Sequence, residues 1–547
     1  MKFTIEQSDA KNIFILVLIS ILFFFVGNNI VALTDPDEVF YSLTAKEMLL
    51  RHEWLTPYIF GHPQFEKPIF TYWLLVLAFK IGGVTPWAAR FFPALFATFS
   101  VVGIYVLTKL IYIDRKRAFF AGLVLATSAI FVGMGKTVFT DMVFTTLILY
   151  AILSFYLGYA KPNLRPVAML AFYFFGALAT LTKGPLGYLI PECVVILFLL
   201  YRRRLDVLMT PWVGIGFALG LVVALPWYLY IYQQYGSAFI NEFFYNDHWR
   251  RLLEAEHRSN DRWFFYPLSM IAGVFPFSFF LVVAIKDLYK RLRDNAGDGD
   301  YLILSWIMVV FIIFQCAHSK LVSYILPLFP VLALLTADAL TRKISKNLLI
   351  AKAVIIALIG AAAIIVPEIL AKKIHLPMLP IFWVSAGLIT LASLVYCAAI
   401  SGRERLGLYF LSGTVMVVLV GGWFAKDIIE DNASCEPASV YLPHQLPNGQ
   451  RILTSKPYAR GISFYTDLPV AVYDPGGKGY FSPHPIPSFS DDKQLSTFLD
   501  TQPMTYAYLK KNGFEHISKA YSDRFTITVI KQFGTNRLVK IEPLPKS

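Results

Sequence analysis

The chain has 547 residues, of which 56% are hydrophobic and only 16% are charged. In soluble globular proteins roughly a quarter of all residues are charged. The composition therefore excludes an ordinary soluble protein and indicates a protein that spans a membrane. The formal net charge of +13 does not point to nucleic acid as a partner, because a polytopic membrane protein concentrates Lys and Arg in short cytoplasmic loops.

The first apolar run follows Lys11 and is about 21 residues long, which is enough to cross the hydrocarbon core of a bilayer. It lacks the small-residue cleavage site of a signal peptide, so we predict a membrane anchor. Further apolar runs bring the number of predicted crossings to thirteen. They lie at about 12–33, 87–112, 117–133, 139–159, 166–182, 185–201, 210–232, 266–286, 301–317, 321–340, 348–367, 379–400 and 405–424.

Basic residues between these runs fall in every second loop, as the positive-inside rule requires if the N-terminus is cytoplasmic. They are Arg115–Arg117, Lys161 with Arg165, Arg202–Arg204, Lys286–Arg293, Arg342–Lys346, and Arg403 with Arg405. The alternation places the loops 34–86 and 233–265, and everything after residue 425, on the far side of the membrane. The apolar stretch 69–83 is too short to span comfortably, and we predict a helix that lies at the interface.

The tail 426–547 is more polar and contains the turn signal "DPGGKG". Its runs "RILTS", "LPVAVYD", "TYAYLKK" and "RFTITVIKQF" are typical of strands, and helix-compatible stretches separate them. We therefore predict a small α/β domain outside the cytoplasm, attached to a membrane module formed by residues 1–425. The tail contains no nucleophile or metal motif, which favours a structural cap. The four cysteines show no paired spacing, so neither a disulfide framework nor a cysteine-based metal site is implied.

Ionisable residues gather at the external membrane face. The first external loop contains "DPDEVFYSLTAKEM", with Asp37 and Glu38, and "FEKP", with Glu66 and Lys67. Further ionisable residues and one tyrosine follow at the same level: Asp141, Lys183, His248, Arg251, His257, Arg258, Lys320 and Tyr324. Acids mixed with several cations at a membrane end indicate a pocket for an anionic group with a carboxylate beside it.

Each of these residues also has a simpler explanation. Asp37 could be the N-cap of a helix, and Lys183 and Lys320 could be interfacial anchors. Arg250 and Arg251 could bind lipid head groups without specificity. His248 and His257 are nine residues apart, which is not the spacing of a helical metal pair. Caps and anchors need not all gather on one face, so the set as a whole favours a functional site.

A lipid with a phosphate head needs cationic groups at the membrane surface. A sugar that leaves this phosphate passes through an oxocarbenium-like transition state, which a neighbouring carboxylate stabilises. The acids and bases predicted at this face therefore have complementary roles in sugar transfer from a lipid phosphate.

The motifs "DPDEVFYSLTAKEM", "FEKPIFTYWL", "TDMVF", "TKGPLGYLIP", "NDHWRRLLEAEHR", "GVFPF" and "SKLVSYILP" follow one another between Asp35 and Pro327. In this order they resemble the GT-C glycosyltransferases that use polyprenyl-phosphate sugars and, within that superfamily, the lipid A aminoarabinose transferases. The resemblance implies an all-α polytopic membrane protein with about thirteen transmembrane helices, juxtamembrane helices and a small C-terminal α/β domain. It further implies a bacterial inner membrane location, with the C-terminal domain in the periplasm.

The resemblance also implies roles for individual residues. Asp37 becomes the catalytic carboxylate and Asp141 the second acid, while Lys67, Arg251, Lys183 and Lys320 bind the donor phosphate. Other residues would line the cavity: Glu38, Tyr41, Glu66, Tyr72, Arg258 and Tyr324. A structural divalent metal such as zinc would map onto Glu66, His248 and His257. The chain has Phe40 where the family often has an arginine, and Ser319 where a glycine often precedes the lysine. Because of these differences, the resemblance does not identify the sugar of the donor.

The best functional prediction is transfer of 4-amino-4-deoxy-L-arabinose from undecaprenyl phosphate to a lipid A phosphate, with inversion. A second prediction is transfer of a mannose-type hexose to protein hydroxyls or another glycan, which would need a general base. A transporter of lipid-linked sugars is the non-enzymatic alternative, although we find no internal repeats or broken mid-membrane helices. A sensor or scaffold would not need thirteen crossings. The predicted partners are the lipid-linked donor, lipid A or another membrane acceptor, and membrane lipids.

Overall fold

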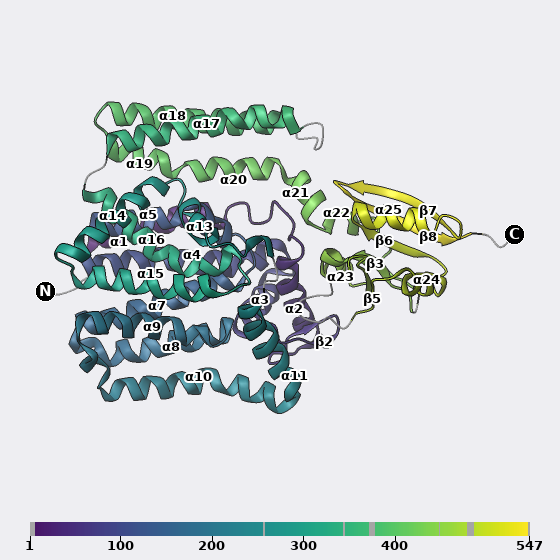
Figure 1. The fold of residues 1–547 in the computed structure, drawn as a ribbon, viewed down its shortest axis with the longest axis horizontal. Helices are drawn as coiled ribbons and strands as arrows, with labels where there is room; N and C mark the ends of the chain where they lie inside the picture. The colour runs from purple at the N-terminus through teal and green to yellow at the C-terminus, as the bar shows by residue number, and fades with distance from the viewer. Residues whose placement is uncertain are drawn as a thin grey trace.

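A computed structural model of the chain describes residues 6–254, 258–342, 345–370, 378–447, 449–477 and 486–544. Long helices that run side by side form the N-terminal part, and one sheet with short helices forms the C-terminal part (Figure 1). Two juxtamembrane helices, α2 (Asp37–Arg51) and α3 (Phe70–Gly82), lie between these parts.

The helices of the N-terminal part follow the predicted apolar runs. They are α1 Gln7–Ser20, α4 Pro86–Tyr112, α5 Arg115–Ala126, α6 Ala129–Gly135, α7 Thr140–Ala160, α8 Arg165–Lys183, α9 Leu186–Arg202, α10 Pro211–Tyr235, α13 Phe265–Gly273, α14 Ser278–Asp294, α15 Asp298–Cys316, α16 Phe329–Arg342, α17 Lys346–Leu370, α18 Met378–Ile400, α19 Glu404–Ser412 and α20 Thr414–Phe424. In the described part of the chain, 10 spans are long and apolar enough to cross a membrane, or up to 12 if each bent helix pair is one span. The remaining predicted crossing, 185–201, corresponds to α9, whose 17 residues are near the lower limit for a span.

Two predicted crossings are bent rather than straight. The axes of α5 and α6 meet at 64°, and those of α13 and α14 at 113°. Pro276 lies in the second break, and a proline ends a helix because it lacks the backbone donor. In the first break the hydroxyls of Thr127 and Ser128 donate to the carbonyls of the preceding turn, at 2.7 and 2.6 Å. Pro276 is a sign of the second bend in the sequence, whereas the apolar pattern of the first run gave no sign of its bend.

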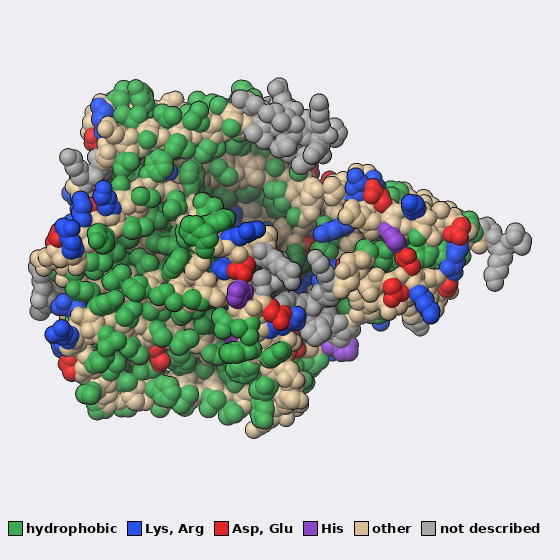
Figure 2. Space-filling view, viewed as in Figure 1, with side chains coloured by type: hydrophobic (Ala, Val, Ile, Leu, Met, Phe, Trp, Pro, Cys, Tyr) green, Lys and Arg blue, Asp and Glu red, His purple; other side chains and the backbone are tan. Residues whose placement is uncertain are grey.

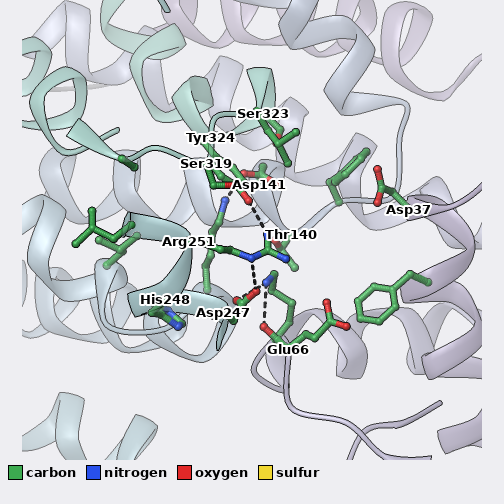
Figure 3. A pocket seen from close by; sticks show the side chains of 18 of the residues that line it. Asp37, Glu66, Thr140, Asp141, Asp247, His248, Arg251, Ser319, Ser323 and Tyr324 are labelled. Atoms are coloured by element: carbon green, nitrogen blue, oxygen red, sulfur yellow. Dashed lines mark hydrogen bonds and ion pairs between the residues drawn. The ribbon is translucent and has the colours of Figure 1, made fainter. Parts of the chain in front are cut away.

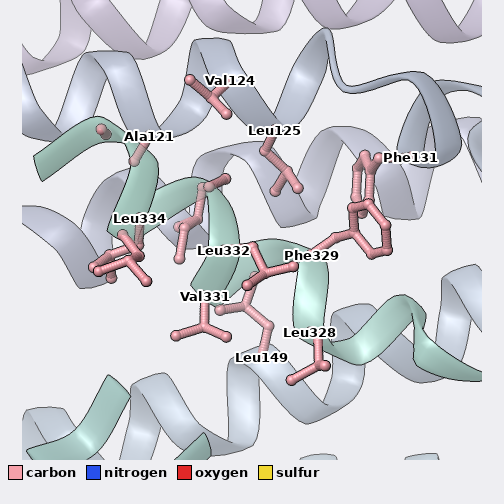
Figure 4. Packing of buried hydrophobic residues seen from close by; sticks show 14 of the residues in the cluster. Ala121, Val124, Leu125, Phe131, Leu149, Leu328, Phe329, Val331, Leu332 and Leu334 are labelled. Atoms are coloured by element: carbon pink, nitrogen blue, oxygen red, sulfur yellow. The ribbon is translucent and has the colours of Figure 1, made fainter. Parts of the chain in front are cut away.

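Helix α16 lies at the centre of the bundle, and every residue from Phe329 to Leu340 is buried. Figure 4 shows Leu332 and Phe329 of this helix packed against side chains of α5, α6 and α7. A helix that is apolar on all sides needs neighbours on all sides, which explains its central position. This core holds α7 and α8, which carry Asp141 and Lys183, in fixed positions.

Helix α3 has 13 residues, too few to cross a bilayer, in agreement with the predicted interfacial helix. It packs on α2 through a second apolar cluster, which includes Leu43, Tyr72 and Val76. Between them, β1 (Tyr58–Ile59) and β2 (His62–Pro63) form a short hairpin. The second loop predicted to be external, 233–265, contains α11 (Ser237–Phe239), a π-helix at Ile240–Arg250 and α12 (Arg251–Leu253).

The C-terminal sheet domain contains one six-stranded sheet in the order β5-β4-β3-β6-β8-β7. Its elements are α21 Lys426–Ala433, α22 Glu436–Ser439, β3 Ile452–Ser455, α23 Ala459–Thr466, β4 Val470–Tyr473, β5 Ser488–Phe489, α24 Asp492–Asp500, β6 Thr505–Leu509, α25 Lys511–Ala520, β7 Phe525–Phe533 and β8 Asn536–Pro543. Strands β5, β4, β3 and β6 are parallel, whereas β8 is antiparallel to β6 and β7. The four runs predicted as strands correspond to β3, β4, β6 and β7, so the predicted α/β fold of the tail is confirmed.

Hydrophobic side chains cover most of the visible face of the helical part, whereas the C-terminal sheet domain has a mixed, charged surface (Figure 2). Lys and Arg gather at the bundle end that faces away from this domain, and charges of both signs gather where the two parts meet. The predicted orientation requires such a basic end opposite the polar C-terminal sheet domain, and the orientation itself stays a prediction.

Candidate active site

A cavity of about 1100 Å³ lies at the junction of the bundle and the C-terminal sheet domain. Its walls come from α2, the segment 66–67, the ends of α7 and α8 that carry Asp141 and Lys183, the second predicted external loop, and residues 313–324. The C-terminal sheet domain adds Lys456, Pro457 and Arg460. The volume exceeds that of pockets for one drug-sized ligand, so there is room for groups from two substrates.

Asp247 organises the cations on one wall. Its carboxylate contacts the Lys67 ammonium at 2.5 Å and the Arg251 guanidinium at 3.0 Å. Burial alone would raise the pKa of Asp247, but Lys67 and Arg251 outweigh this effect and lower the pKa to about 2. The Lys67 ammonium also donates to the Glu66 carbonyl at 2.9 Å. Two cations are thus held side by side at a buried, ionised carboxylate.

A second acid and base pair lies at the ends of α7 and α8. The buried Lys183 ammonium is paired with the buried Asp141 carboxylate and lies 4.5 Å from the centre of the Tyr324 ring. The Tyr324 hydroxyl accepts a hydrogen bond of 2.8 Å from Arg251. The two ion pairs therefore form one network, as Figure 3 shows for Asp141, Tyr324, Arg251 and Asp247.

Asp37 is the first residue of α2 and lines the cavity with an exposed side chain. It is not the N-cap, because that position belongs to Pro36. In Figure 3, Asp37 lies on the other side of the open space from Arg251. Burial raises the pKa of the nearby Tyr41, and the charges of Asp141 and Asp37 raise it further, which places the Tyr41 ring in the field of both acids.

Glu66 is buried on the same wall as Lys67. Burial raises the pKa of this carboxyl, although Arg460 and Lys67 partly oppose the shift. The Arg460 guanidinium is 3.9 Å from Glu66 and stacks on the Phe40 ring, at 4.5 Å from its centre. This is the point at which a side chain of the C-terminal sheet domain meets the membrane module inside the cavity.

Glu38 was expected to line the cavity, and the structure corrects this expectation. Its carboxylate is buried against Arg90, with hydrogen bonds of 2.9 and 2.6 Å, and it accepts backbone N–H bonds from Thr34 and Val138. Burial would raise the pKa of Glu38, but Arg90 more than offsets this and the pKa is lowered. Glu38 therefore joins the first loop to α4 and to the segment just before α7, and it has a structural role.

We expect Glu38→Gln to lower the free energy of unfolding by about 3–5 kcal/mol, because it leaves the buried Arg90 charge without its ionic partner. The apparent melting temperature of the purified protein in detergent measures this loss. The double variant that combines Glu38→Gln with Arg90→Met should lose less than the sum of the single losses. A Glu38→Gln protein that melts like the wild type would contradict the structural role.

Two other expected site residues also lie outside the set that lines the cavity. Tyr72 is buried behind the wall, where its hydroxyl accepts a 2.8 Å hydrogen bond from Gln64. Lys320 is buried and paired with Asp261 at 2.5 Å. The cavity brings together the other described residues that were expected there: Asp37, Tyr41, Glu66, Lys67, Asp141, Lys183, His248, Arg251 and Tyr324. His257 and the side chain of Arg258 lie outside the described residues.

The predicted metal ligands do not form a metal site in the part of the chain that the structure describes, where no group of three His, Cys, Asp or Glu residues has the required proximity. The Nδ1 atom of His248 is 2.7 Å from the Phe243 carbonyl, and its ring packs edge-on against the Phe243 ring. Burial lowers the pKa of His248. Glu66 faces Arg460 rather than an imidazole. Glu66 and His248 thus each have another partner, and His257, the third predicted ligand, lies outside the described residues.

Sequence reasoning missed two features of the cavity. Asp247 was one charge among several in its loop, and only the fold shows that it joins Lys67 to Arg251. Arg460 and Lys456 lie in "KPYARGI", which has no catalytic motif and is more than 400 residues from Asp37 in sequence. Only the docking of α23 on α2 brings them to the site.

Residues 66–230 match a protein-family model described as dolichyl-phosphate-mannose-protein mannosyltransferase. An uncharacterized protein of Aquifex aeolicus is 32% identical over 342 residues, which cover 61% of this chain and 65% of that protein. The undecaprenyl phosphate-alpha-4-amino-4-deoxy-L-arabinose arabinosyl transferase of Edwardsiella ictaluri is 30% identical over 340 residues, which cover 61% of this chain and 60% of that protein. The matches thus span less than two thirds of the length of these relatives.

Among solved structures, ArnT from Cupriavidus metallidurans bound to undecaprenyl phosphate matches with a TM-score of 0.76 and 19% identity, over 96% of this chain and 97% of that one. The archaeal oligosaccharyltransferase AglB from Archaeoglobus fulgidus matches with a TM-score of 0.52 and 12% identity, over 98% of this chain and 74% of that one. The chain therefore has the fold of the GT-C glycosyltransferases. The resemblance that the sequence motifs predicted is confirmed, both in fold and in sequence similarity.

Proposed function

We propose that this protein is a glycosyltransferase of the bacterial inner membrane that moves a sugar from undecaprenyl phosphate to a phosphate of lipid A at the periplasmic face. The sugar that best fits the relatives is 4-amino-4-deoxy-L-arabinose. Residues 1–425 would form the catalytic membrane module and residues 426–547 the periplasmic domain. The N-terminus would then be cytoplasmic, in agreement with the basic loops.

One observation carries the proposal: a single cavity at the external end of the bundle contains the exposed carboxylate of Asp37 together with Lys67 and Arg251, which share Asp247. The cations suit the phosphate of a lipid-linked sugar, and Asp37 suits the positive charge that develops on the sugar. Hydrophobic residues of the second external loop, such as Trp249 and Leu252, complete the wall and are exposed. They offer a path for the polyprenyl chain.

In this reaction an oxygen of the lipid A phosphate attacks the anomeric carbon while the bond to the donor phosphate oxygen breaks. The leaving undecaprenyl phosphate keeps the electron pair, and Lys67 and Arg251 stabilise its negative charge. The acceptor phosphate is already an anion at neutral pH, so Asp37 need not remove a proton and acts on the developing oxocarbenium charge. A single displacement of this kind inverts the anomeric configuration.

The family model that matches residues 66–230 favours a second candidate, transfer of a mannose-type hexose to a protein hydroxyl. A hydroxyl must lose its proton when it attacks, so Asp37 would then serve as general base. The same cavity would bind the lipid phosphate in both reactions. The two candidates differ in the acceptor and in the need for a base.

Mass spectrometry of lipid A from cells with and without this protein tests the proposal, and we expect a mass increase that corresponds to one aminoarabinose. Purified protein should reproduce this product from the lipid-linked donor. Unchanged lipid A together with an altered glycoprotein or glycan would favour the second candidate. If no sugar reaches any acceptor from any polyprenyl-phosphate donor, the protein is no transferase, and a transporter of the lipid-linked sugar becomes the better explanation.

A further inference from the structure

The loop that precedes α2 is hydrogen-bonded to the end of α21 and the turn that follows it in the C-terminal sheet domain. Three bonds join them: Ala32 N–H to the Glu430 carboxylate at 2.7 Å, Asp35 N–H to the Ala433 carbonyl at 2.7 Å, and the Ser434 hydroxyl to the Leu33 carbonyl at 2.8 Å. We call residues 32–35 and 430–435 the docking seam. Asp37, the first residue of α2, follows the seam after a single proline, whose ring fixes φ. The seam therefore determines where this helix begins.

The Asp35 carboxyl lies inside the docking seam. Its Oδ2 atom accepts the Cys435 N–H at 2.9 Å, and its Oδ1 atom is buried and has no hydrogen-bond partner among the described residues. The carboxyl lies directly on Gly461 of α23, where a Cβ would be only 2.3 Å from Oδ1. The glycine thus leaves the space that this carboxyl fills. Asp35 contacts both the turn after α21 and α23, so its state affects how the C-terminal sheet domain docks.

Burial raises the pKa of Asp35 to about 8, although Cys435 and the charge of Arg460 partly oppose the shift. The other titratable groups that face Asp35 are one thiol and three phenols: Cys435, Tyr458, Tyr465 and Tyr508. Burial raises the pKa of each of these groups as well, and all four are neutral at pH 7. Between pH 4 and pH 9, Asp35 is therefore the group in this set that changes its charge.

The Asp35 proton couples docking to pH. An Asp carboxyl in water has a pKa of about 3.9, whereas Asp35 has a pKa of about 8 when the domain is docked. The docked state binds the proton more tightly, so the equilibrium constant for docking falls by about tenfold for each pH unit between about 4 and 8, and then levels off. Above pH 8 the docked carboxyl itself is ionised, and a buried carboxylate favours any movement that exposes it to water.

We propose that the protonated Asp35 carboxyl keeps the docking seam closed and thereby positions Asp37 in the cavity, so that ionisation of Asp35 opens the seam and slows sugar transfer. Asp35 lies outside the set of residues that lines the cavity, and it acts through Asp37 as a positioning residue. The effect on transfer rests on the proposed function, in which Asp37 is the catalytic carboxylate. The proton-linked docking does not depend on that function.

Thermal unfolding of the full chain in nanodiscs from pH 5 to pH 9 tests the docking step. Asp35→Asn keeps an acceptor oxygen for the Cys435 N–H and cannot ionise. Its apparent melting temperature should rise relative to that of the wild type up to about pH 8, and the difference should then stay constant. Both proteins keep Glu430, whose pKa burial also raises, so its contribution cancels. Asp35→Ser, which is smaller and also cannot ionise, gives the same comparison if Asp35→Asn folds poorly.

The matched control is Lys46→Met, at another contact between α2 and the C-terminal sheet domain. The Lys46 ammonium donates to the Phe464 carbonyl at 2.6 Å and pairs with Asp467 at 2.7 Å. Lys46→Met leaves the Asp35 proton in place, so its melting temperature should lie below that of the wild type by a similar amount at every pH. If the difference between Asp35→Asn and the wild type is equally independent of pH, the docking seam is not linked to a proton and the inference is wrong.

Initial rates at saturating donor and acceptor test the positioning step. At pH 7 the kcat values of the wild type and Asp35→Asn should agree within about twofold, whereas at pH 9 Asp35→Asn should be faster by up to about tenfold, the change in the docking equilibrium over this range. The donor KM should be the same in both proteins, because Asp35 lies outside the cavity lining. Identical pH profiles of kcat would overturn the positioning role, even if melting depends on pH as expected.

The melting comparison also separates this inference from the proposed function. If no sugar is transferred at any pH, the proposed reaction fails, while the melting temperatures still decide whether docking is linked to the Asp35 proton. If transfer occurs but Asp35→Asn and the wild type respond to pH in the same way in both measurements, the reaction stands and the inference is overturned.

Discussion

Asp37→Asn should lower kcat for sugar transfer by about 10²- to 10³-fold, the usual cost of removing one group that stabilises charge in a transition state. Asn has nearly the same shape as Asp but no negative charge to stabilise the oxocarbenium-like sugar. The KM for the donor should change little, because Asp37 lies on the other side of the open space from Arg251 (Figure 3). Initial rates with purified protein, at saturating donor and acceptor, measure the effect.

Asp35→Asn is the matched control, since it makes the same chemical change two residues earlier. The Asp35 carboxylate accepts the Cys435 N–H at 2.9 Å, and an Asn oxygen can accept the same bond. Burial raises the pKa of Asp35 to about 8, so at pH 7 its carboxyl is mostly neutral, as an amide always is. The transfer rate of Asp35→Asn should therefore stay near that of the wild type.

An Asp37→Asn protein that keeps full activity would contradict the catalytic role. Asp141 would not then become the candidate for the catalytic carboxylate, because its own carboxylate is buried and paired with Lys183. A loss of activity that appears only as a higher donor KM would instead place Asp37 among the residues that bind the donor in its ground state.

The helical fold could be predicted from sequence because apolar length and loop charge are local signals. Strong apolar runs gave the crossings, and alternating basic loops gave their orientation. The four main strands of the tail were also readable from β-rich runs between turns. The bends at Thr127–Ser128 and Pro276 were missed, because the crossings were predicted from mean hydropathy, which a short break hardly changes, and Pro276 was not used as a break signal.

The cavity was harder to predict, because a charged residue at a membrane end can face a site or a structural partner. Glu38 and Asp37 are neighbours in sequence, yet on α2 one is buried against Arg90 and the other is exposed to the cavity. A helix turns by about 100° per residue, so neighbours face different surroundings. Arg460 could not be found at all, since its place depends on a contact between segments more than 400 residues apart.

Removal of one of the two cations beside Asp247 should lower the efficiency with which the enzyme uses the lipid-linked donor. We expect Lys67→Met and Arg251→Met each to lower kcat/KM for the undecaprenyl-phosphate-linked sugar by about 10- to 100-fold, because each loses a charge-assisted hydrogen bond to the phosphate. Arg251→Met also removes the 2.8 Å hydrogen bond to the Tyr324 hydroxyl. Titration with undecaprenyl phosphate should show weaker binding for both variants.

The matched control for Arg251 is its neighbour Arg250. Its guanidinium pairs with Glu254 at 2.8 Å on the protein surface and lies outside the residues that line the cavity. Arg250→Met should therefore leave kcat/KM and the binding of undecaprenyl phosphate unchanged. If Arg250→Met weakens donor use as much as Arg251→Met, the effect comes from general attraction of anionic lipid to a basic loop and not from a phosphate site.

The double variant that combines Lys67→Met with Arg251→Met should show how far the two cations act as a unit. Both contact the one carboxylate of Asp247, so removal of either changes the surroundings of the other, and their effects should not add.

When both cations are removed, the buried Asp247 carboxylate loses the partners that lower its pKa, so its pKa should rise from about 2. A group with a lowered pKa contributes stability above its unfolded pKa of about 3.9 and loses it as the pH falls. The double variant should therefore melt at a lower temperature than wild type at pH 7, with a smaller difference near pH 3. Equal melting temperatures at pH 7 would mean that Asp247 does not depend on these cations, and Asp247 would no longer explain why Lys67 and Arg251 lie side by side.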